Sequence, residues 1–181
     1  MNPSRLLRVL LVSVVLGSTA FAADDYRLSP DSLVQPGVPQ GTWDKFVWES
    51  KIFAGTGRDV WVYIPAQYNA AEPTRFMVFQ DGVRQYALRE GREPGRNTEY
   101  AVPNVLDNLI HKGELPVIIG IFIDPGSHDM KGRNGTPNFT NRSHEYDSPT
   151  IDYARFLEEE IIPEVERRGY NLRKDADGRA I

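Results

Sequence analysis

The sequence predicts an α/β fold in which two antiparallel strands are followed by a parallel sheet with flanking helices. Two early segments, 46–53 and 59–64, are rich in the aromatic and β-branched residues that favour strands. A one-sided apolar stripe with helical spacing then occupies 102–112, and a nearly uninterrupted apolar run follows at 116–123. A continuous apolar run suits a strand that is covered by helices on both faces, so these segments together indicate the α/β class.

The first 22 residues have the pattern of a cleavable secretory signal peptide. Arg5 and Arg8 precede an apolar run, and an A-x-A cleavage motif occupies 20–22. The run is too short for a membrane helix, which needs about 20 apolar residues. We therefore expect a periplasmic or secreted protein that has no stable membrane anchor after cleavage. An uncleaved N-terminal anchor is the alternative.

The composition limits the classes of protein to which the chain can belong. It contains no cysteine, so its stability must come from a hydrophobic core rather than from disulfides. The formal net charge is −4, and lysine and arginine are scattered along the chain. Binding to nucleic acid requires a basic patch or stripe, and so we expect no nucleic acid partner.

Proline and glycine interrupt any periodicity at 23–42, which predicts an extended lead-in. No repeat or second change of composition follows, so 43–181 is expected to form one domain. Turn-forming residues at 54–57 should join the two early strands into an antiparallel pair. A third apolar run begins at residue 75 and stops at Asp81-Gly82.

The helix predicted at 102–112 has a signal at each end. Pro103 suits the first turn of a helix, and Gly113 directly follows the last turn. The apolar strand at 116–123 comes next, and a polar loop at 124–147 follows it. Loops of that length within a compact domain are usually functional or disordered.

The last helix is expected to begin with Ser148 as its N-cap and Pro149 in its first turn. Pro163 should kink or divide this helix because its ring blocks a backbone hydrogen bond, and Gly169 should end it. A strand should then begin at 179–181. The predicted apolar face comprises Ala154, Leu157, Ile161 and Val165, and the predicted solvated residues are Glu158, Glu159, Glu160, Glu164 and Glu166.

Several separated blocks lie in a defined order between residues 46 and 181: "VWESKIFAGTGRDVWVYIPAQYNAAEPTRFMVFQDG", "VPNVLDNLIHKGELPVIIGIFIDPG", "NRSHEYDS", "YARFLEEEIIPEVE" and "GRAI". Together they resemble the enterochelin esterase and esterase D-like family of α/β-hydrolases. The resemblance implies that 43–181 forms the N-terminal, partial half of an α/β-hydrolase fold. It also implies that the full-length protein hydrolyses a small-molecule ester through a histidine-activated serine, without a cofactor.

In this family the strand that "GRAI" resembles leads into a nucleophile elbow, A-G-x-S-x-G-G, whereas the present sequence contains no G-x-S-x-G. We therefore expect a chain that is truncated about two residues before the elbow, with the catalytic serine, acid and histidine beyond Ile181. The family's order of serine, acid and histidine excludes His111, His128 and His144 as the catalytic histidine. The 181 residues alone are expected to be inactive.

The resemblance places Asp81, Gly82 and Val83 in the oxyanion loop after the third strand. Backbone N–H groups of that loop stabilise the negative oxygen of the tetrahedral intermediate. The alternative is that Asp81-Gly82 forms only a tight turn after a strand.

Arg142, Glu145 and Tyr146 are candidates for the substrate side of the site. They follow the strand at 116–123, near the edge where open α/β sheets bind ligands. Arg142 could clamp an anionic group of a substrate, with Glu145 holding Arg142 in place. The alternative is an ion pair that fixes the loop, with Asp147 or Ser148 capping the next helix.

A metal site is not expected, because the carboxylates and histidines at 124–145 have spacings that match no known site. The alternative to an esterase is a non-catalytic exported binding module or a degenerate hydrolase. Such a module would hold a carbohydrate or aromatic ligand against Trp48, Trp61 and Tyr63. Aromatic residues that alternate along strands are, however, more often part of a core.

Overall fold

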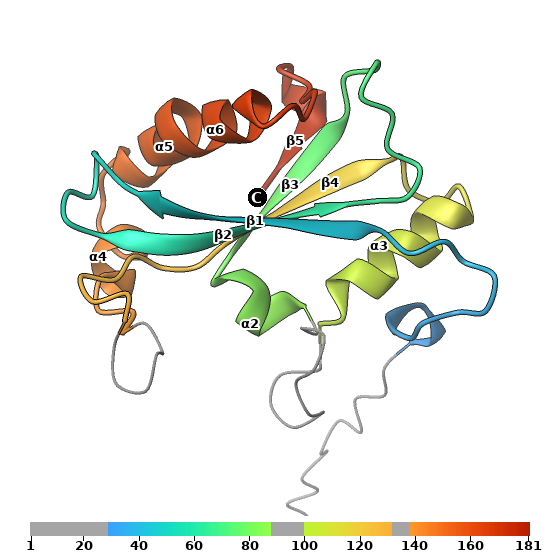
Figure 1. Cartoon of the computed structure of the whole chain (residues 1–181), viewed down its shortest axis with the longest axis horizontal. Coiled ribbons are helices and arrows are strands. Elements are labelled where there is room, and N and C mark those ends of the chain that lie inside the picture. The colour runs from blue at the N-terminus through green and yellow to red at the C-terminus, as the bar shows by residue number, and fades with distance from the viewer. Residues whose placement is uncertain (1–28, 88–99, 132–137) are drawn as a thin grey trace, which may run out of the picture.

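The computed structural model describes residues 29–87, 100–131 and 138–181. The predicted signal peptide at 1–22 lies outside the described residues, as does the lead-in up to residue 28. A five-stranded mixed sheet in the order β1-β2-β4-β3-β5 forms the centre of the molecule (Figure 1). The strands are β1 (Thr42–Glu49), β2 (Gly57–Ile64), β3 (Arg75–Gln80), β4 (Ile118–Ile123) and β5 (Arg179–Ala180).

The strand directions confirm the predicted change from antiparallel to parallel pairing. β1 and β2 pair antiparallel along their whole length, and β2 continues antiparallel to β4. β3 then pairs in parallel with both β4 and β5. Every residue of β4 is buried, as its uninterrupted apolar sequence predicted.

β1 begins and ends about four residues earlier than predicted. The reason is a turn at 50–56, where the Ser50 hydroxyl accepts a hydrogen bond from the Phe53 N–H at 2.9 Å. The Thr56 N–H and hydroxyl both donate to the Phe53 carbonyl. A side chain that satisfies backbone groups locally favours a turn over a strand.

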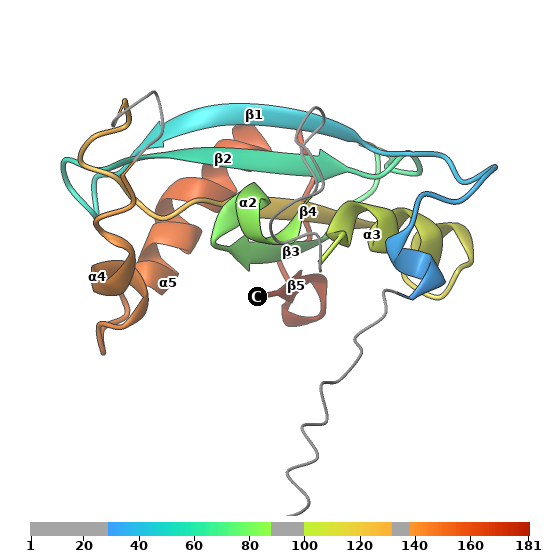
Figure 2. The same ribbon diagram turned by 90° about the horizontal axis from the view of Figure 1, so that it is seen from below.

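Helices cover both faces of the sheet (Figures 1 and 2). One face carries α5 (Asp152–Phe156), η4 (Leu157–Ile161) and α6 (Ile162–Arg167), which form one continuous helical stretch, and the short α4 (Arg142–Tyr146) precedes them. The other face carries α2 (Gly82–Tyr86) and α3 (Val102–His111). Two short 3-10 turns, η2 (Pro30–Ser32) and η5 (Ala176–Gly178), complete the described elements.

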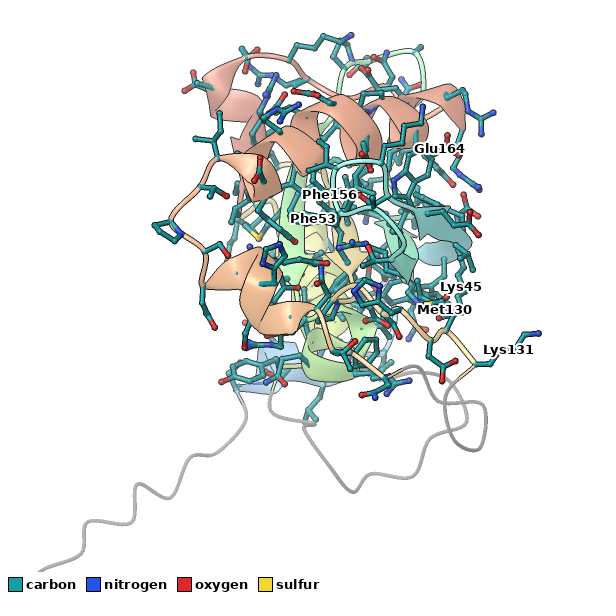
Figure 3. The ribbon with its side chains drawn as sticks, turned by 90° about the vertical axis from the view of Figure 1, so that its left-hand side faces the viewer. Lys45, Phe53, Met130, Lys131, Phe156 and Glu164 are labelled. Carbon is teal, nitrogen blue, oxygen red and sulfur yellow. The ribbon has the colours of Figure 1, made fainter. Side chains whose placement is uncertain are left out.

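The sheet separates two apolar clusters. The larger cluster fills the space under the terminal helix and includes Phe53 and Phe156, whose ring centroids are 5.6 Å apart (Figure 3). The smaller cluster lies under α2 and α3 and includes Tyr63, Leu106 and Phe122. A core on each face is what an α/β sheet requires.

The start of the terminal helix differs from its prediction. Ser148 is not the N-cap, because residues 148–150 form a turn and the helix begins at Asp152, with Ile151 in the cap position. The Thr150 hydroxyl accepts a hydrogen bond from the Asp152 N–H at 3.3 Å. The predicted kink or division at Pro163 takes the form of a change of helix type within a continuous stretch: a π-helical turn precedes Pro163, closed by the Ile162 N–H donating to the Leu157 carbonyl.

Two of the five glutamates predicted to be solvated are buried. Glu160 is only 6% exposed and Glu164 7% exposed, whereas Ala154 of the predicted apolar face is exposed. An α-helix has 3.6 residues per turn, so residues spaced four apart are slightly more than one turn apart and their row winds around the helix. The π turn has more residues per turn, and it therefore rotates the row back towards the sheet. The rows 156–160–164 and 157–161–165 therefore both face the sheet.

The buried glutamates have partners that explain their position. Glu160 accepts hydrogen bonds from the Trp48 indole N–H and from the backbone N–H groups of Lys51 and Ile52. Glu164 accepts from Arg167 and Arg168. Within the described ranges, no helix is both long and apolar enough to cross a membrane.

Candidate active site

The candidate site begins where β3 ends. Asp81 and Gly82 follow β3 directly, and both have positive φ values, 65° and 64°. Asp81 is the one non-glycine residue with a positive φ in the part of the chain that the structure describes. A non-glycine residue with such a φ raises the free energy of the folded state by about 1–3 kcal/mol, so it persists only where its surroundings hold it. Such residues are typical of functional sites. We refer to Asp81, Gly82 and Val83 as the oxyanion loop, the role that the resemblance predicts for them.

Glycine at position 82 is required by space as well as by φ. A Cβ atom there would lie 1.7 Å from Oδ1 of Asp124 and 3.0 Å from its backbone nitrogen. Asp124 directly follows β4, and its N–H donates to the Asp59 carbonyl. The carboxyl ends of β3 and β4 therefore meet at this point, with the Asp124 carboxylate against the backbone of the oxyanion loop.

The oxyanion loop also forms the start of α2. Gly82 and Val83 are the first two residues of this helix, and the N–H groups in a first turn have no acceptor within the helix. They can therefore donate to an acceptor outside the helix. A negatively charged oxygen is the acceptor that two backbone N–H groups favour most.

Two residues of α4 hold Asp81. Arg142 donates to both carboxylate oxygens, from Nε at 2.6 Å and from Nη2 at 2.7 Å. The Tyr146 hydroxyl accepts a hydrogen bond from the Asp81 N–H at 3.2 Å. Burial raises the pKa of Tyr146 to about 12, so its hydroxyl stays protonated at neutral pH. Positions 142 and 146 are one helical turn apart, which places both side chains on the same face of α4.

The pairing predicted between Arg142 and Glu145 is not the one found. Arg142 pairs with Asp81, and the Arg142 side chain is 49% exposed. Glu145 is buried and pairs instead with Arg58, whose Nη1 and Nη2 lie 2.6 and 2.9 Å from the two carboxylate oxygens. Arg142 lies on the exposed side of the short helix whereas Glu145 is buried, and so they reach different partners.

Arg58 is the site residue that sequence reasoning missed. It lies in β2, is fully buried, and stacks over the Phe156 ring with Cζ 4.3 Å from the centroid. Its partner Glu145 also accepts from the Asn141 amide at 2.7 Å and the Gly126 N–H at 3.3 Å. This buried pair ties the loop at 124–147 to the sheet. The available signal was the pair of charged residues, Arg58 and Asp59, at the start of a strand whose remaining residues are apolar or aromatic.

Other candidates from the sequence do not gather into a site. Among the residues that the structure describes, no group of three histidines, aspartates or glutamates could hold a metal ion. Trp48 packs with the cluster under the terminal helix, whereas Trp61 and Tyr63 pack with the cluster under α3. The platform predicted from Trp48, Trp61 and Tyr63 is therefore split between the two faces of the sheet.

A family model described as "Putative esterase" matches residues 50–181, which include β2, β3, β4 and β5 but not β1. The chain belongs to this esterase family. The oxyanion loop, α4 and Arg58 all lie within the matched segment of the esterase chain.

Solved structures of ferulic acid esterases show that the esterase chain has an α/β-hydrolase fold. A CE1 ferulic acid esterase from the anaerobic fungus Anaeromyces mucronatus, without substrate, matches with a TM-score of 0.58 at 21% identity. The match covers 85% of this chain and 53% of the fungal one. The same enzyme in complex with ferulic acid matches with a TM-score of 0.58 at 19% identity, over 85% and 52% of the two chains. The esterase chain thus spans about half the length of these structures, and no curated protein sequence matches it.

Proposed function

We propose that this chain forms the oxyanion side of the active site of a serine ester hydrolase. The observation that carries the proposal is the corner at Asp81-Gly82, where two consecutive positive φ values place the start of α2 at the carboxyl edge of the sheet. Arg142 and Tyr146 hold this corner from α4. An oxyanion hole must be rigid before the reaction begins, and such a brace provides that rigidity.

In the proposed reaction, a serine hydroxyl attacks the ester carbonyl carbon while a histidine removes its proton. The carbonyl π electrons move to the oxygen, which becomes an oxyanion. The N–H groups of the oxyanion loop, with one N–H from the residue after the serine, donate to this oxygen. Collapse of the intermediate expels the alcohol, and water then hydrolyses the acyl-enzyme.

The proposed source of the serine is a nucleophile elbow after β5. β5 pairs in parallel with β3, with Phe76 opposite Arg179 and Met77 opposite Ala180. A residue that follows β5 would therefore emerge at the same edge of the sheet as the oxyanion loop. This arrangement supports an elbow beside Asp81, which is where the family resemblance predicts one.

The proposal also covers the location of the enzyme and the class of ester to assay first. The signal-peptide pattern at 1–22 supports a periplasmic or secreted enzyme. The structurally similar fungal enzyme is a ferulic acid esterase that has been observed with ferulic acid. Alkyl esters of hydroxycinnamic acids are therefore the first substrates to assay, with 4-nitrophenyl acetate as a general ester.

The first test is to read the coding DNA beyond the codon for Ile181. We expect an open frame that continues into a G-x-S-x-G elbow, followed by an aspartate or glutamate and then a histidine. An in-frame stop directly after the Ile181 codon would overturn the proposal, because the sequence up to Ile181 contains no such elbow.

The second test replaces Arg142 in the protein encoded by the complete reading frame. Arg142→Ala should lower kcat/KM about 10- to 100-fold through kcat, because a displaced oxyanion loop stabilises the transition state less. Arg155→Ala is the matched control, since Arg155 also pairs with a carboxylate on the surface but lies on α5. It should leave kcat/KM within about twofold. Equal losses in both variants would contradict a role for Arg142 in bracing the site.

A further inference from the structure

A pocket lies on the face of the sheet that carries α3. Its volume is about 570 Å³, which is within the range of small-molecule binding sites. β1 and β2 provide Trp43, Trp61 and Tyr63, and α3 provides Asn104 and Asp107. The segment before β1 contributes Gln40.

Aromatic rings form one wall of this pocket. The Trp43 ring meets the Trp61 ring edge to face, with centroids 6.1 Å apart and an interplanar angle of 88°. Trp43 also packs against Tyr63, at 4.8 Å between centroids, and against Phe122, at 5.3 Å. Trp43 nevertheless stays 37% exposed. An indole that is fixed on one side and open on the other provides a flat apolar surface for a ligand.

Buried polar groups lie beside this wall. The Tyr63 hydroxyl donates a short hydrogen bond to the Asp107 carboxylate, and the Gly41 N–H donates to the Tyr63 oxygen at 2.9 Å. Tyr63 is 2% exposed and Asp107 4% exposed. A carboxylate has about four lone-pair positions, so Asp107 can accept further hydrogen bonds from a ligand. The Asn104 amide donates to the Ser32 carbonyl at 3.0 Å, which fixes its side chain and leaves its oxygen as an acceptor.

The charges around the pocket select among possible ligands. The Lys45 ammonium lies 4.7 Å from the centroid of the Trp61 ring and pairs with Asp59 at 2.6 Å. A second cation at this wall would be repelled by Lys45, and rings packed at 6.1 Å leave no space for a cation between them. An anionic ligand would be repelled by Asp107. A neutral ligand with an apolar face and several hydroxyl donors fits both restrictions.

We propose that this pocket binds a neutral sugar ring of a carbohydrate. The apolar C–H face of the sugar stacks on Trp43, and sugar hydroxyls donate to Asp107 and to the Asn104 oxygen. The binding platform is thus formed by Trp43 with Trp61 and Tyr63, whereas Trp48 lies on the other face of the sheet. Val83 of the oxyanion loop also lines the pocket, which places the sugar next to the candidate ester site.

The proposal does not depend on ester hydrolysis, because binding can be measured without turnover. We would titrate the purified protein with xylotetraose and with cellotetraose by isothermal titration calorimetry. Sodium ferulate and tetramethylammonium chloride serve as the anionic aromatic and the cationic probe. A fluorescence titration in the Trp48→Phe background would then report on Trp43 and Trp61 alone, since the chain contains three tryptophans.

Saturable binding of at least one oligosaccharide is expected. Trp43→Ala should weaken it about tenfold or more, because the stacking surface is lost. Trp43→Phe, which keeps the packing against Tyr63, should weaken it less and guards against misfolding of the alanine variant. Gln40→Ala should weaken binding about two- to threefold. Trp48→Phe should leave the affinity unchanged.

Three results would overturn the proposal. The first is the absence of saturable binding of both oligosaccharides at 10 mM, a concentration on the order of ten times a millimolar Kd. The second is tighter binding of ferulate or tetramethylammonium than of either sugar. The third is an affinity for the sugar that is equal in the wild type and in both folded Trp43 variants.

Discussion

Gly82 is the residue on which the geometry of the candidate site depends most directly. Its φ of 64° disfavours a side chain, and so does Asp124 Oδ1, which lies 1.7 Å from the position that a Cβ atom would occupy. Asp81 beside it has a similar φ but carries a side chain, and this side chain is the group that Arg142 clamps. Gly82 thus permits the close approach of Asp124, and Asp81 is the residue that Arg142 holds in place.

Gly82→Ala should destabilise the fold by about 3 kcal/mol or more, because it combines a left-handed conformation with a collision. Gly113→Ala is the matched control, since Gly113 has a φ of 72° and nothing within 4 Å of a Cβ. It should cost only about 1–2 kcal/mol for the left-handed conformation. Urea denaturation measures both values. Equal losses of stability in the two variants would contradict the prediction, because Asp124 would then move away from the added methyl group at no cost in free energy.

At the scale of the element, the terminal helix shows how a local irregularity sets which residues are buried. Pro163 has no N–H to continue an α-helix, and the π turn before it accommodates this. The turn brings Glu160 towards β1, where the Trp48 indole and two backbone N–H groups donate to its carboxylate. Burial opposes ionisation of Glu160, but these hydrogen bonds outweigh burial and lower its pKa below the ordinary value.

Glu160→Gln should therefore destabilise the fold by about 1–3 kcal/mol at pH 7, because hydrogen bonds to a charged acceptor are lost. A carboxyl whose pKa is lowered on folding stabilises the protein above its unfolded pKa, and this contribution is lost as the pH falls through the folded value. The difference between wild type and variant should thus shrink below about pH 4.5. Thermal and urea denaturation across a range of acidic to neutral pH would show this.

The control for this prediction is Glu159→Gln, which changes the neighbouring glutamate. The side chain of Glu159 is 54% exposed and pairs with Arg155 on the surface of the helix. Its replacement should change stability by less than about 0.5 kcal/mol at any pH. A larger effect at position 159 than at 160 would contradict the assignment of Glu160 as the buried acceptor.

Elements with strong local signals could be predicted from the sequence. α3 runs from Val102 to His111, with Pro103 in its first turn and Gly113 just beyond its end, as predicted; Gly113 has a positive φ. The start of α5 could not be predicted, because Ser148 competes with Thr150 for the role of local hydrogen-bond acceptor. The burial of Glu160 was also hidden, since its partners on and after β1 lie more than 100 residues away in the sequence.

At the scale of the whole molecule, contacts between distant segments assemble the candidate site. The end of a strand and a glycine were enough to predict a sharp turn at Asp81-Gly82, and the family resemblance suggested its role. The clamp on Asp81 and the Arg58–Glu145 pair join segments 61 and 87 residues apart. Neither pairing has a local pattern, and so a single sequence suggested Glu145 as the partner of Arg142 instead.

Breaking the buried Arg58–Glu145 pair should be costly. Glu145→Gln leaves the Arg58 charge buried without its counter-ion and should destabilise the fold by about 3–5 kcal/mol. The double variant Arg58→Met/Glu145→Leu removes both charges and should be less destabilised than Glu145→Gln, since buried ion pairs barely exceed their desolvation cost. Urea denaturation of both variants tests this. A double variant that is destabilised as much as Glu145→Gln, or more, would contradict the prediction.

The loop after β4 is thus attached at two points that differ in their access to water. The Arg58–Glu145 pair has no exposed side-chain surface, whereas Arg142 and Asp81 are 49% and 27% exposed. Mobile ions screen charges that solvent reaches, over a Debye length of about 10 Å at 0.1 M salt, and hardly affect buried pairs. Ionic strength should therefore loosen the corner at Asp81 while the loop as a whole stays attached. Rising salt concentration should therefore alter the candidate site at concentrations that leave the stability of the fold unchanged.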